Sequence, residues 1–254
     1  MSLNEILLWL SSCCLAVIAL LYGSGYLEIL ISWIFVILCI GNARRIQSRT
    51  NLNIIMIVRR NMYVLPMLVP LLWKDTFTGL RSTEPVHYLW IAVGLMLGFC
   101  FLLPKLNVWK IALSTEFIVM GGIQRRVDSL TMLYTMLAAP FVEEFFFRYF
   151  IITAGHSKLM VVNVFISAAL FFLSHFGTKW SSDFSTYDFV IQFSFGLCSA
   201  GLFIASGSLI PSILAHLVYN SLHIIKHSKH FYLSFREDWN LDCEGWNDGE
   251  GNRS

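Results

Sequence analysis

The 254-residue sequence has few charged residues, since only 13% are Asp, Glu, Lys or Arg, against roughly 25% in soluble domains. With 56% hydrophobic residues and a mean hydropathy of +0.65, it has more apolar surface than one soluble core could hide. The net charge of +2 is too small and too scattered for a nucleic-acid-binding surface, which needs a basic stripe. The composition excludes soluble, disordered and nucleic-acid-binding classes, and it favours a protein embedded in a bilayer.

The sequence also lacks a cysteine framework. Cys243 lies in a polar tail without an evident partner, and no CxxC pair indicates a metal or redox site. The N-terminus has neither the positive region nor the cleavage site of a signal peptide, so we expect its apolar run to be a retained span. The other five cysteines lie in apolar runs, where a thiol packs as a small hydrophobe: Cys13, Cys14, Cys39, Cys100 and Cys198.

Long apolar runs predict an all-α, polytopic membrane protein with about eight transmembrane helices. The polar turn Gly23-Ser24-Gly25 separates the first two spans, and Gly207 and Pro211 are expected to divide the charge-free run 189–225 into the last two. The segment 105–122 could be a further crossing, a tilted helix or an interfacial helix. The candidate spans are about 6–22, 26–41, 54–73, 85–104, 129–152, 159–176 and the two helices within 189–225.

The span at 54–73 contains Arg59 and Arg60, which are costly inside a membrane unless they reach an interface. The basic loop 41–49 precedes this span and is expected to be cytoplasmic together with the N-terminus. We divide the chain into N-terminal transmembrane helices (1–128), a helical core (129–226) and a polar acidic tail (227–254). From Arg236 onward the tail is predicted to be solvated and partly disordered.

Three ionisable residues lie among aromatics within the span at 129–152: Glu143, Glu144 and Arg148. Glu144 and Arg148 are four residues apart, so on a helix they lie within about 40° and can form an ion pair. Glu143 is turned about 100° away from Glu144 and shares Arg148 less easily. A carboxylate without a partner in a dry site can accept a proton and return it, which suits a general base. The alternative is that all three residues form a fixed clamp between helices.

Two later helices carry further polar residues. His175 closes the apolar stretch of one helix, where a cap or a packed core residue is the simpler interpretation. His216 and Asn220 are four residues apart on the last helix and share a face, as residues that join helices by hydrogen bonds also would. Together with the two glutamates they provide a base, two imidazoles and an amide, the groups needed to attack an amide with water and stabilise the oxyanion.

This pattern resembles the type II CAAX prenyl endopeptidases and their bacterial relatives, the CPBP or ABI group of glutamate-dependent intramembrane proteases. The family motifs EExxxR, FxxxH and HxxxN read here as Glu143-Glu144 with Arg148, Phe171 with His175, and His216 with Asn220. The similarity covers about residues 129–226.

The resemblance implies a role for each motif residue. Glu143 and His175 would position and deprotonate a water molecule, while His216 and Asn220 would stabilise the oxyanion. Glu144 and Arg148 would support the site. Neither a cofactor nor a metal is implied. The partners expected are the lipid bilayer and a membrane-associated protein or peptide substrate, with the chain in a bacterial plasma membrane rather than the endoplasmic reticulum.

Other classes compete with this interpretation. A zinc protease could use Glu and two His as ligands, although HExxH is absent. A serine protease would want a GxSG-type motif, and Ile204-Ala205-Ser206-Gly207 lacks the first glycine; an aspartyl protease would need two buried aspartates. The same cluster could also serve as a proton or ion relay in a transporter. It could equally hold together a non-catalytic immunity or scaffolding protein.

Overall fold

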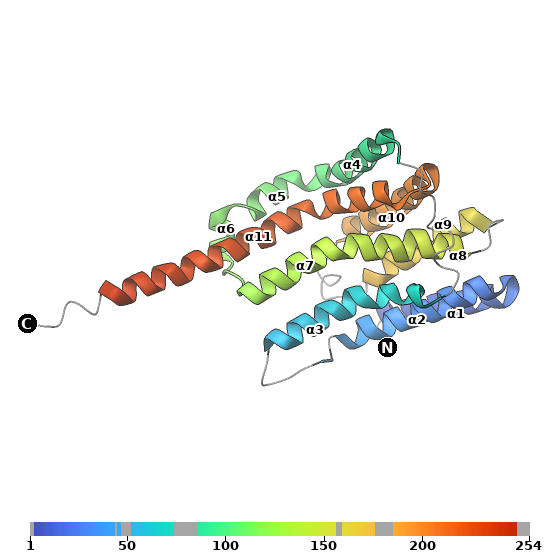
Figure 1. Ribbon diagram of the computed structural model, residues 1–254, viewed down its shortest axis with the longest axis horizontal. Coiled ribbons are helices and arrows are strands. Elements are labelled where there is room, and N and C mark those ends of the chain that lie inside the picture. The colour runs from blue at the N-terminus through green and yellow to red at the C-terminus, as the bar shows by residue number, and fades with distance from the viewer. Residues whose placement is uncertain are drawn as a thin grey trace, which may run out of the picture.

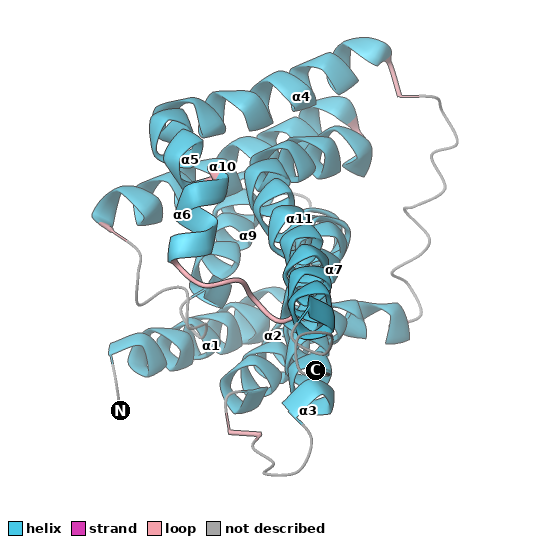
Figure 2. Cartoon of the chain, turned by 90° about the vertical axis from the view of Figure 1, so that its left-hand side faces the viewer, coloured by secondary structure: helices cyan, strands magenta, loops and turns pink. Residues whose placement is uncertain are grey.

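The computed structural model describes residues 3–43, 45–46, 52–73, 86–155, 159–175 and 185–247, with side chains from Ile6 to Phe235. Every regular element in these ranges is helical (Figure 2). Both views place α4 and α5 on one side of the bundle and α1 to α3 on the other, with α7 and α11 between them (Figures 1 and 2). The α-helices are α1 (Leu3–Tyr22), α2 (Ser24–Ala43), α3 (Leu52–Val64), α4 (Tyr88–Leu102), α5 (Leu106–Ala112), α6 (Thr115–Met120), α7 (Arg126–Glu143), α8 (Ile151–Ala154), α9 (Met160–Ser174), α10 (Thr186–Ser206) and α11 (Leu209–Asn247).

Three further segments have other helical geometries. The 3₁₀ segments η1 (Leu65–Leu72) and η2 (Leu103–Lys105) follow α3 and α4 directly, and the π-helical segment η3 (Glu144–Phe150) joins α7 to α8. Each therefore belongs to a longer continuous rod.

Five segments of the described chain are long and apolar enough to cross a membrane. The predicted all-helical, multi-pass membrane protein is confirmed at this level, whereas the number of eight spans stays a prediction. The segment 105–122 forms no separate long span, because α5 continues α4 and α6 has only six residues. Apolar helices at Ile6–Tyr22 and Met160–Ser174 are shorter. The five long segments are Ser24–Ala43, Leu52–Leu72, Tyr88–Ala112, Arg126–Ala154 and Thr186–Ser206.

Glycines end two helices where the sequence predicted breaks. Gly23 has a φ of 100° and separates α1 from α2, and Gly207 has a φ of 65° in the left-handed region that glycine tolerates best. The Gly207 N–H donates to the Phe203 carbonyl and so closes the last turn of α10. Pro211 lies in the first turn of α11, where its missing N–H costs no helical hydrogen bond.

The C-terminal tail differs from the sequence prediction. The backbone of α11 is helical to Asn247, past Arg236, where partial disorder was expected. Figure 1 shows this helix projecting well beyond the other helices. A polar composition indicates exposure to water but does not exclude a helix that continues directly from a packed one. The prediction of a disordered tail is therefore wrong as far as Asn247.

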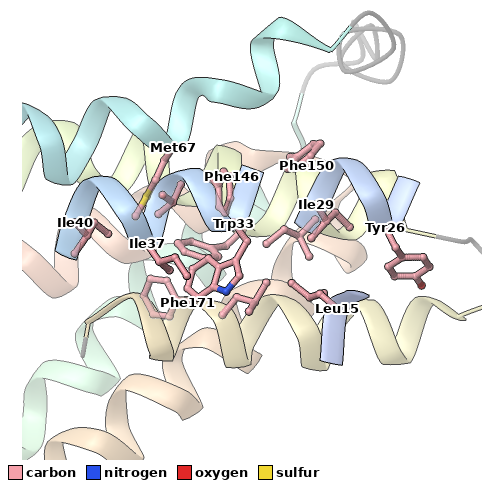
Figure 3. Close-up of a cluster of buried hydrophobic side chains, with 14 of the residues drawn as sticks. Leu15, Tyr26, Ile29, Trp33, Ile37, Ile40, Met67, Phe146, Phe150 and Phe171 are labelled. Atoms are coloured by element: carbon pink, nitrogen blue, oxygen red, sulfur yellow. The ribbon is translucent and has the colours of Figure 1, made fainter. Parts of the chain in front are cut away.

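An aromatic core joins α2 to the segment that carries the glutamates. Figure 3 shows Trp33 and Ile37 of α2 gathered with Phe146 of η3 and Phe171 of α9. Trp33, Phe146 and Phe171 have no exposed surface. Aromatic side chains each bury about 150–250 Å², so this cluster holds η3 firmly against its neighbours.

Two glycines allow α4 to lie directly against α11. A Cβ atom at Gly94 would collide with the Pro211 carbonyl, and one at Gly98 would collide with the Ala215 carbonyl. Gly94 and Gly98 form the small-xxx-small pattern by which helix backbones approach closely in membranes. The contact of Gly98 with Ala215 therefore fixes the position of α11 next to His216.

Replacing Gly98 tests this packing. Gly98→Val should destabilise the protein by about 1–3 kcal/mol, as overpacking does, because a backbone carbonyl cannot move aside like a side-chain tip. Gly201→Val in α10 is the matched control, since nothing lies within 4 Å of a Cβ there. Thermal unfolding in detergent micelles measures both variants. Equal unfolding midpoints would contradict the close contact of α4 with α11.

Candidate active site

Glu144 and Arg148 form a fully buried ion pair. Arg148 Nε lies 3.1 Å from Glu144 Oε2, and neither side chain has any exposed surface. The pairing predicted from their spacing is therefore present, although the segment between them is π-helical rather than α-helical. Such segments recur at functional sites, and nothing in the motif spacing predicted this one.

Two serines from other helices form hydrogen bonds with this ion pair, while Arg148 Nη2 is buried without a hydrogen-bond partner among the described residues. Ser199 of α10 donates to Glu144 Oε2 at 2.6 Å and accepts from Arg148 Nε at 3.2 Å. Ser167 of α9 accepts from Arg148 Nη1 at 3.3 Å. The guanidinium also lies 4.5 Å from the centre of the Phe171 ring, within cation–π range. The pair thus ties η3 to both α9 and α10.

His216 joins the same network from α11. Its Nδ1 lies 2.9 Å from Glu144 Oε1, and because a carboxylate oxygen accepts, Nδ1 donates the hydrogen. The opposite ring nitrogen, Nε2, lies 3.9 Å from Glu143 Oε2, beyond hydrogen-bond range. Glu144 therefore holds the His216 ring with Nε2 toward Glu143.

Glu143 has a different environment from Glu144. Its side chain is 14% exposed and lines a cavity, and its Oε2 atom is buried without a hydrogen-bond partner among the described residues. Arg148, the nearest cation in sequence, is taken by Glu144. The structure agrees with the helical-wheel prediction that one carboxylate of the motif is paired and the other is not.

His175 follows α9 directly. Its Nδ1 lies 2.9 Å from the Phe171 carbonyl and therefore donates, which leaves Nε2 as the acceptor of the neutral ring. The Gln192 amide nitrogen of α10 lies 3.1 Å from that Nε2 and donates to it. Gln192 also lines the cavity. It therefore orients the His175 ring and is itself part of the cavity wall.

Asn220 replaces a backbone hydrogen bond that is missing from α7. Pro140 has no backbone N–H, so the Met136 carbonyl lacks its usual helical donor. Asn220 Nδ2 donates to that carbonyl at 3.3 Å. This bond attaches α11 to α7 about two turns before Glu143.

One cavity of about 920 Å³ brings the predicted catalytic residues together. Glu143, His175, His216 and Asn220 all line it, whereas Glu144 and Arg148 lie behind its wall. The catalytic and supporting roles of these six residues stay predictions. Within the described part of the chain, no group of three His, Cys, Asp or Glu side chains is arranged to hold a metal ion.

Sequence reasoning missed Gln192, Ser199 and Ser167, which orient the site. Gln192 and Ser199 are seven residues apart and so share a face of α10. Polar side chains with helical spacing inside a run free of charge are the signal that could have identified them.

Residues 125–222 match a family model described as Type II CAAX prenyl endopeptidase Rce1-like. No curated protein and no solved structure matches the chain. The matched segment runs from the residue before α7 into α11 and contains all six predicted site residues. The resemblance drawn from the three motifs is confirmed, and the family's printed description is of peptidases.

The free energy of unfolding should distinguish the structural role of Glu144 from that of Glu143. Arg148→Leu should cost about 3–5 kcal/mol, because removing one partner leaves the Glu144 charge buried without compensation. Glu143→Gln should leave stability nearly unchanged, because no hydrogen bond or ion pair within bonding distance is lost. Unfolding in detergent micelles, followed by circular dichroism, measures both variants. A large loss of stability in Glu143→Gln would show that Glu143 supports the fold.

Proposed function

We propose that this chain, whose residues 125–222 match the Rce1-like type II CAAX prenyl endopeptidase family model, hydrolyses a peptide bond in a membrane-associated protein or peptide. The observation that carries the proposal is the position of Glu143. Its Oε2 atom is buried without a hydrogen-bond partner among the described residues, faces His216 across 3.9 Å, and borders a cavity large enough for a peptide segment.

In the proposed reaction, Glu143 acts as the general base. A water molecule bound between Glu143 and the imidazoles loses a proton to Glu143 as its oxygen attacks the scissile carbonyl carbon. The C–N bond then breaks, and the leaving amine takes the proton back from Glu143. The neutral His175 ring keeps Nε2 as an acceptor, so it can help orient the same water once Gln192 releases it.

His216 and Asn220 supply the proposed oxyanion site. When both ring nitrogens of His216 carry hydrogens, Nδ1 donates to Glu144 and the Nε2–H can donate to the developing negative oxygen. Asn220 uses one amide hydrogen on the Met136 carbonyl and keeps the other for the substrate. Such preorganised donors have their largest effect where water is excluded.

We also propose that eight helical rods of the described chain cross the membrane: α1, α2, α3 with η1, α4 with α5, α7 with η3 and α8, α9, α10 and α11. The basic loop that follows α2 favours a cytoplasmic position for that loop and for the N-terminus. A bacterial plasma membrane is the proposed location.

A non-catalytic membrane protein is the second candidate. The Glu144, Arg148 and Ser199 network is largely satisfied by its own members and would also serve a purely structural clamp. A structural clamp does not explain why a second carboxylate, that of Glu143, is present with its Oε2 atom buried and without a hydrogen-bond partner in the described chain. An ion relay through a transporter would use Glu143, and loss of transport rather than of cleavage would identify it.

Glu143→Gln should lower peptide cleavage by about 10²–10⁴-fold, the usual contribution of a general base, while the protein stays folded. The measurement is mass spectrometry of membrane proteins from cells that express the wild type or the variant. One chain should accumulate uncleaved with the variant. Glu116→Gln on α6 is the matched control, since Glu116 is exposed and lies outside the cavity. Continued cleavage by a folded Glu143→Gln protein would reject the proposed base.

Chelators should leave the cleavage rate unchanged, because carboxylate-activated water needs no metal ion. The assay compares purified wild-type protein with and without 1,10-phenanthroline, using the substrate identified above. A loss of activity that added zinc restores would favour the zinc protease, with Glu143 and the two histidines as ligands.

A further inference from the structure

Tyr219 lines the cavity but has no part in the proposed hydrolysis. It lies on α11 three residues after His216 and directly before Asn220, the two residues of the proposed oxyanion site. Tyrosine hydroxyls inside proteins usually have a hydrogen-bond partner, as the Tyr134 hydroxyl has in Asn61 Oδ1 at 3.1 Å. The Tyr219 hydroxyl forms no hydrogen bond with any residue in the described part of the chain. Its presence in the cavity wall therefore calls for a functional account.

The Tyr219 ring is held in place by Phe195 of α10. The two rings are stacked nearly parallel, with their centroids 5.1 Å apart and an angle of 19° between their planes. Phe195 is fully buried, and its centroid also lies 5.2 Å from that of the His216 ring. The Tyr219 hydroxyl is thus positioned by a packed ring, and it loses little freedom when it binds a ligand.

The carboxylate that lies near the Tyr219 hydroxyl already has partners. Asp188 of α10 is within electrostatic range of this hydroxyl and also lines the cavity. Its Oδ1 atom forms an ion pair with Lys105, and its Oδ2 atom accepts hydrogen bonds from the backbone N–H and the hydroxyl of Ser185. The Tyr219 hydroxyl is therefore left for a group that enters the cavity.

Helix geometry places Tyr219 beside the reacting groups. Tyr219 is turned about 60° from His216 in one direction around α11, and Asn220 is turned about 40° in the other. The Asn220 amide bonds to α7 while the Tyr219 ring packs on α10, so these two side chains flank His216 from opposite sides. Three residues of an α-helix span about 4.5 Å, and an extended peptide covers about 3.3–3.6 Å per residue. Along α11, Tyr219 therefore lies about one peptide residue from His216.

The group that Tyr219 binds can be inferred from its chemistry. Every residue of a peptide has a backbone carbonyl, whereas only some have a polar side chain. A phenol hydroxyl is neutral and donates one hydrogen, which suits a carbonyl oxygen. We propose that the Tyr219 hydroxyl donates a hydrogen bond to the backbone carbonyl of the substrate residue next to the scissile bond. This inference rests on the proposed peptidase function and adds a substrate-binding residue on the opposite side of His216 from Asn220.

Tyr219→Phe removes the hydroxyl and keeps the ring. Added to full-length Glu143→Gln protein in detergent micelles, it should weaken binding of a fluorescein-labelled aliphatic octapeptide about three- to tenfold, as loss of a neutral hydrogen bond predicts. Fluorescence anisotropy measures this binding. The unfolding midpoint, followed by circular dichroism, should not change, because no hydrogen bond within the described chain is lost. Tyr134→Phe is the matched control and should leave binding unchanged, since Tyr134 lies outside the cavity.

An ester scan of the same octapeptide identifies the carbonyl. Replacing one backbone amide by an ester makes its carbonyl a weaker acceptor. One such ester should lower the affinity about threefold with Tyr219 present and should cost less after Tyr219→Phe, since the two changes then remove the same bond. This coupling separates a direct contact from an indirect effect on the cavity. Equal binding with and without the hydroxyl, absence of coupling at every position, a lower unfolding midpoint, or failure of the octapeptide to bind would each overturn the proposal.

Kinetics separate this inference from the proposed function. With a substrate that the wild type cleaves, Tyr219→Phe should raise KM about three- to tenfold and leave kcat nearly unchanged, as for a contact made equally in the ground state and the transition state. Cleavage with an unchanged KM would reject the contact and leave the peptidase standing. Peptide binding that depends on Tyr219, without cleavage by the wild type, would reject the peptidase and leave a peptide-binding cavity. A loss of kcat alone would overturn the binding role, because the hydroxyl would then act in the chemical step.

Discussion

The buried ion pair of Glu144 and Arg148 is the constraint on which the rest of the site depends. Two charges without access to water are each costly by several kcal/mol unless hydrogen-bond partners surround them. One helix cannot supply those partners. They come instead from Ser167 on α9, Ser199 on α10 and His216 on α11. Satisfying one pair of charges therefore brings four segments of the chain to a single point.

This arrangement gives two adjacent carboxylates different chemistry. The Glu144 carboxylate is ion-paired with an arginine and hydrogen-bonded to a serine and a histidine, so it acts as a fixed negative charge. Glu143 is one residue earlier, faces the cavity and keeps an oxygen without a partner among the described residues. The rotation of about 100° per residue in a helix is enough to place one carboxylate in the wall and the other in the chamber. The supporting pair also orients His216, so structure and proposed catalysis share one network.

Much of this could be predicted from helical periodicity. Spacing of four residues correctly paired Glu144 with Arg148 and placed His216 and Asn220 on one cavity-lining face. Gly23 and Gly207 marked helix ends because their backbone conformations suit glycine. The π-helical segment and the contact of Gln192 with His175 could not be predicted, since both depend on how separate helices approach one another. Composition also failed for α11 beyond Arg236, because it reports exposure to water rather than helix length.

Asn220 shows how a backbone defect can fix a residue in the proposed active site. Pro140 removes the helical donor of the carbonyl of buried Met136, and an unpaired buried carbonyl costs about as much as a lost hydrogen bond. Leucine at position 220 would leave that carbonyl unpaired, and serine has a single hydrogen that it could give either to Met136 or to a substrate. An asparagine amide has two hydrogens and can serve both. Asn220 therefore supplies the hydrogen bond that Pro140 removes from α7. The same bond holds the Asn220 amide at the cavity, where its second hydrogen can be donated to a substrate.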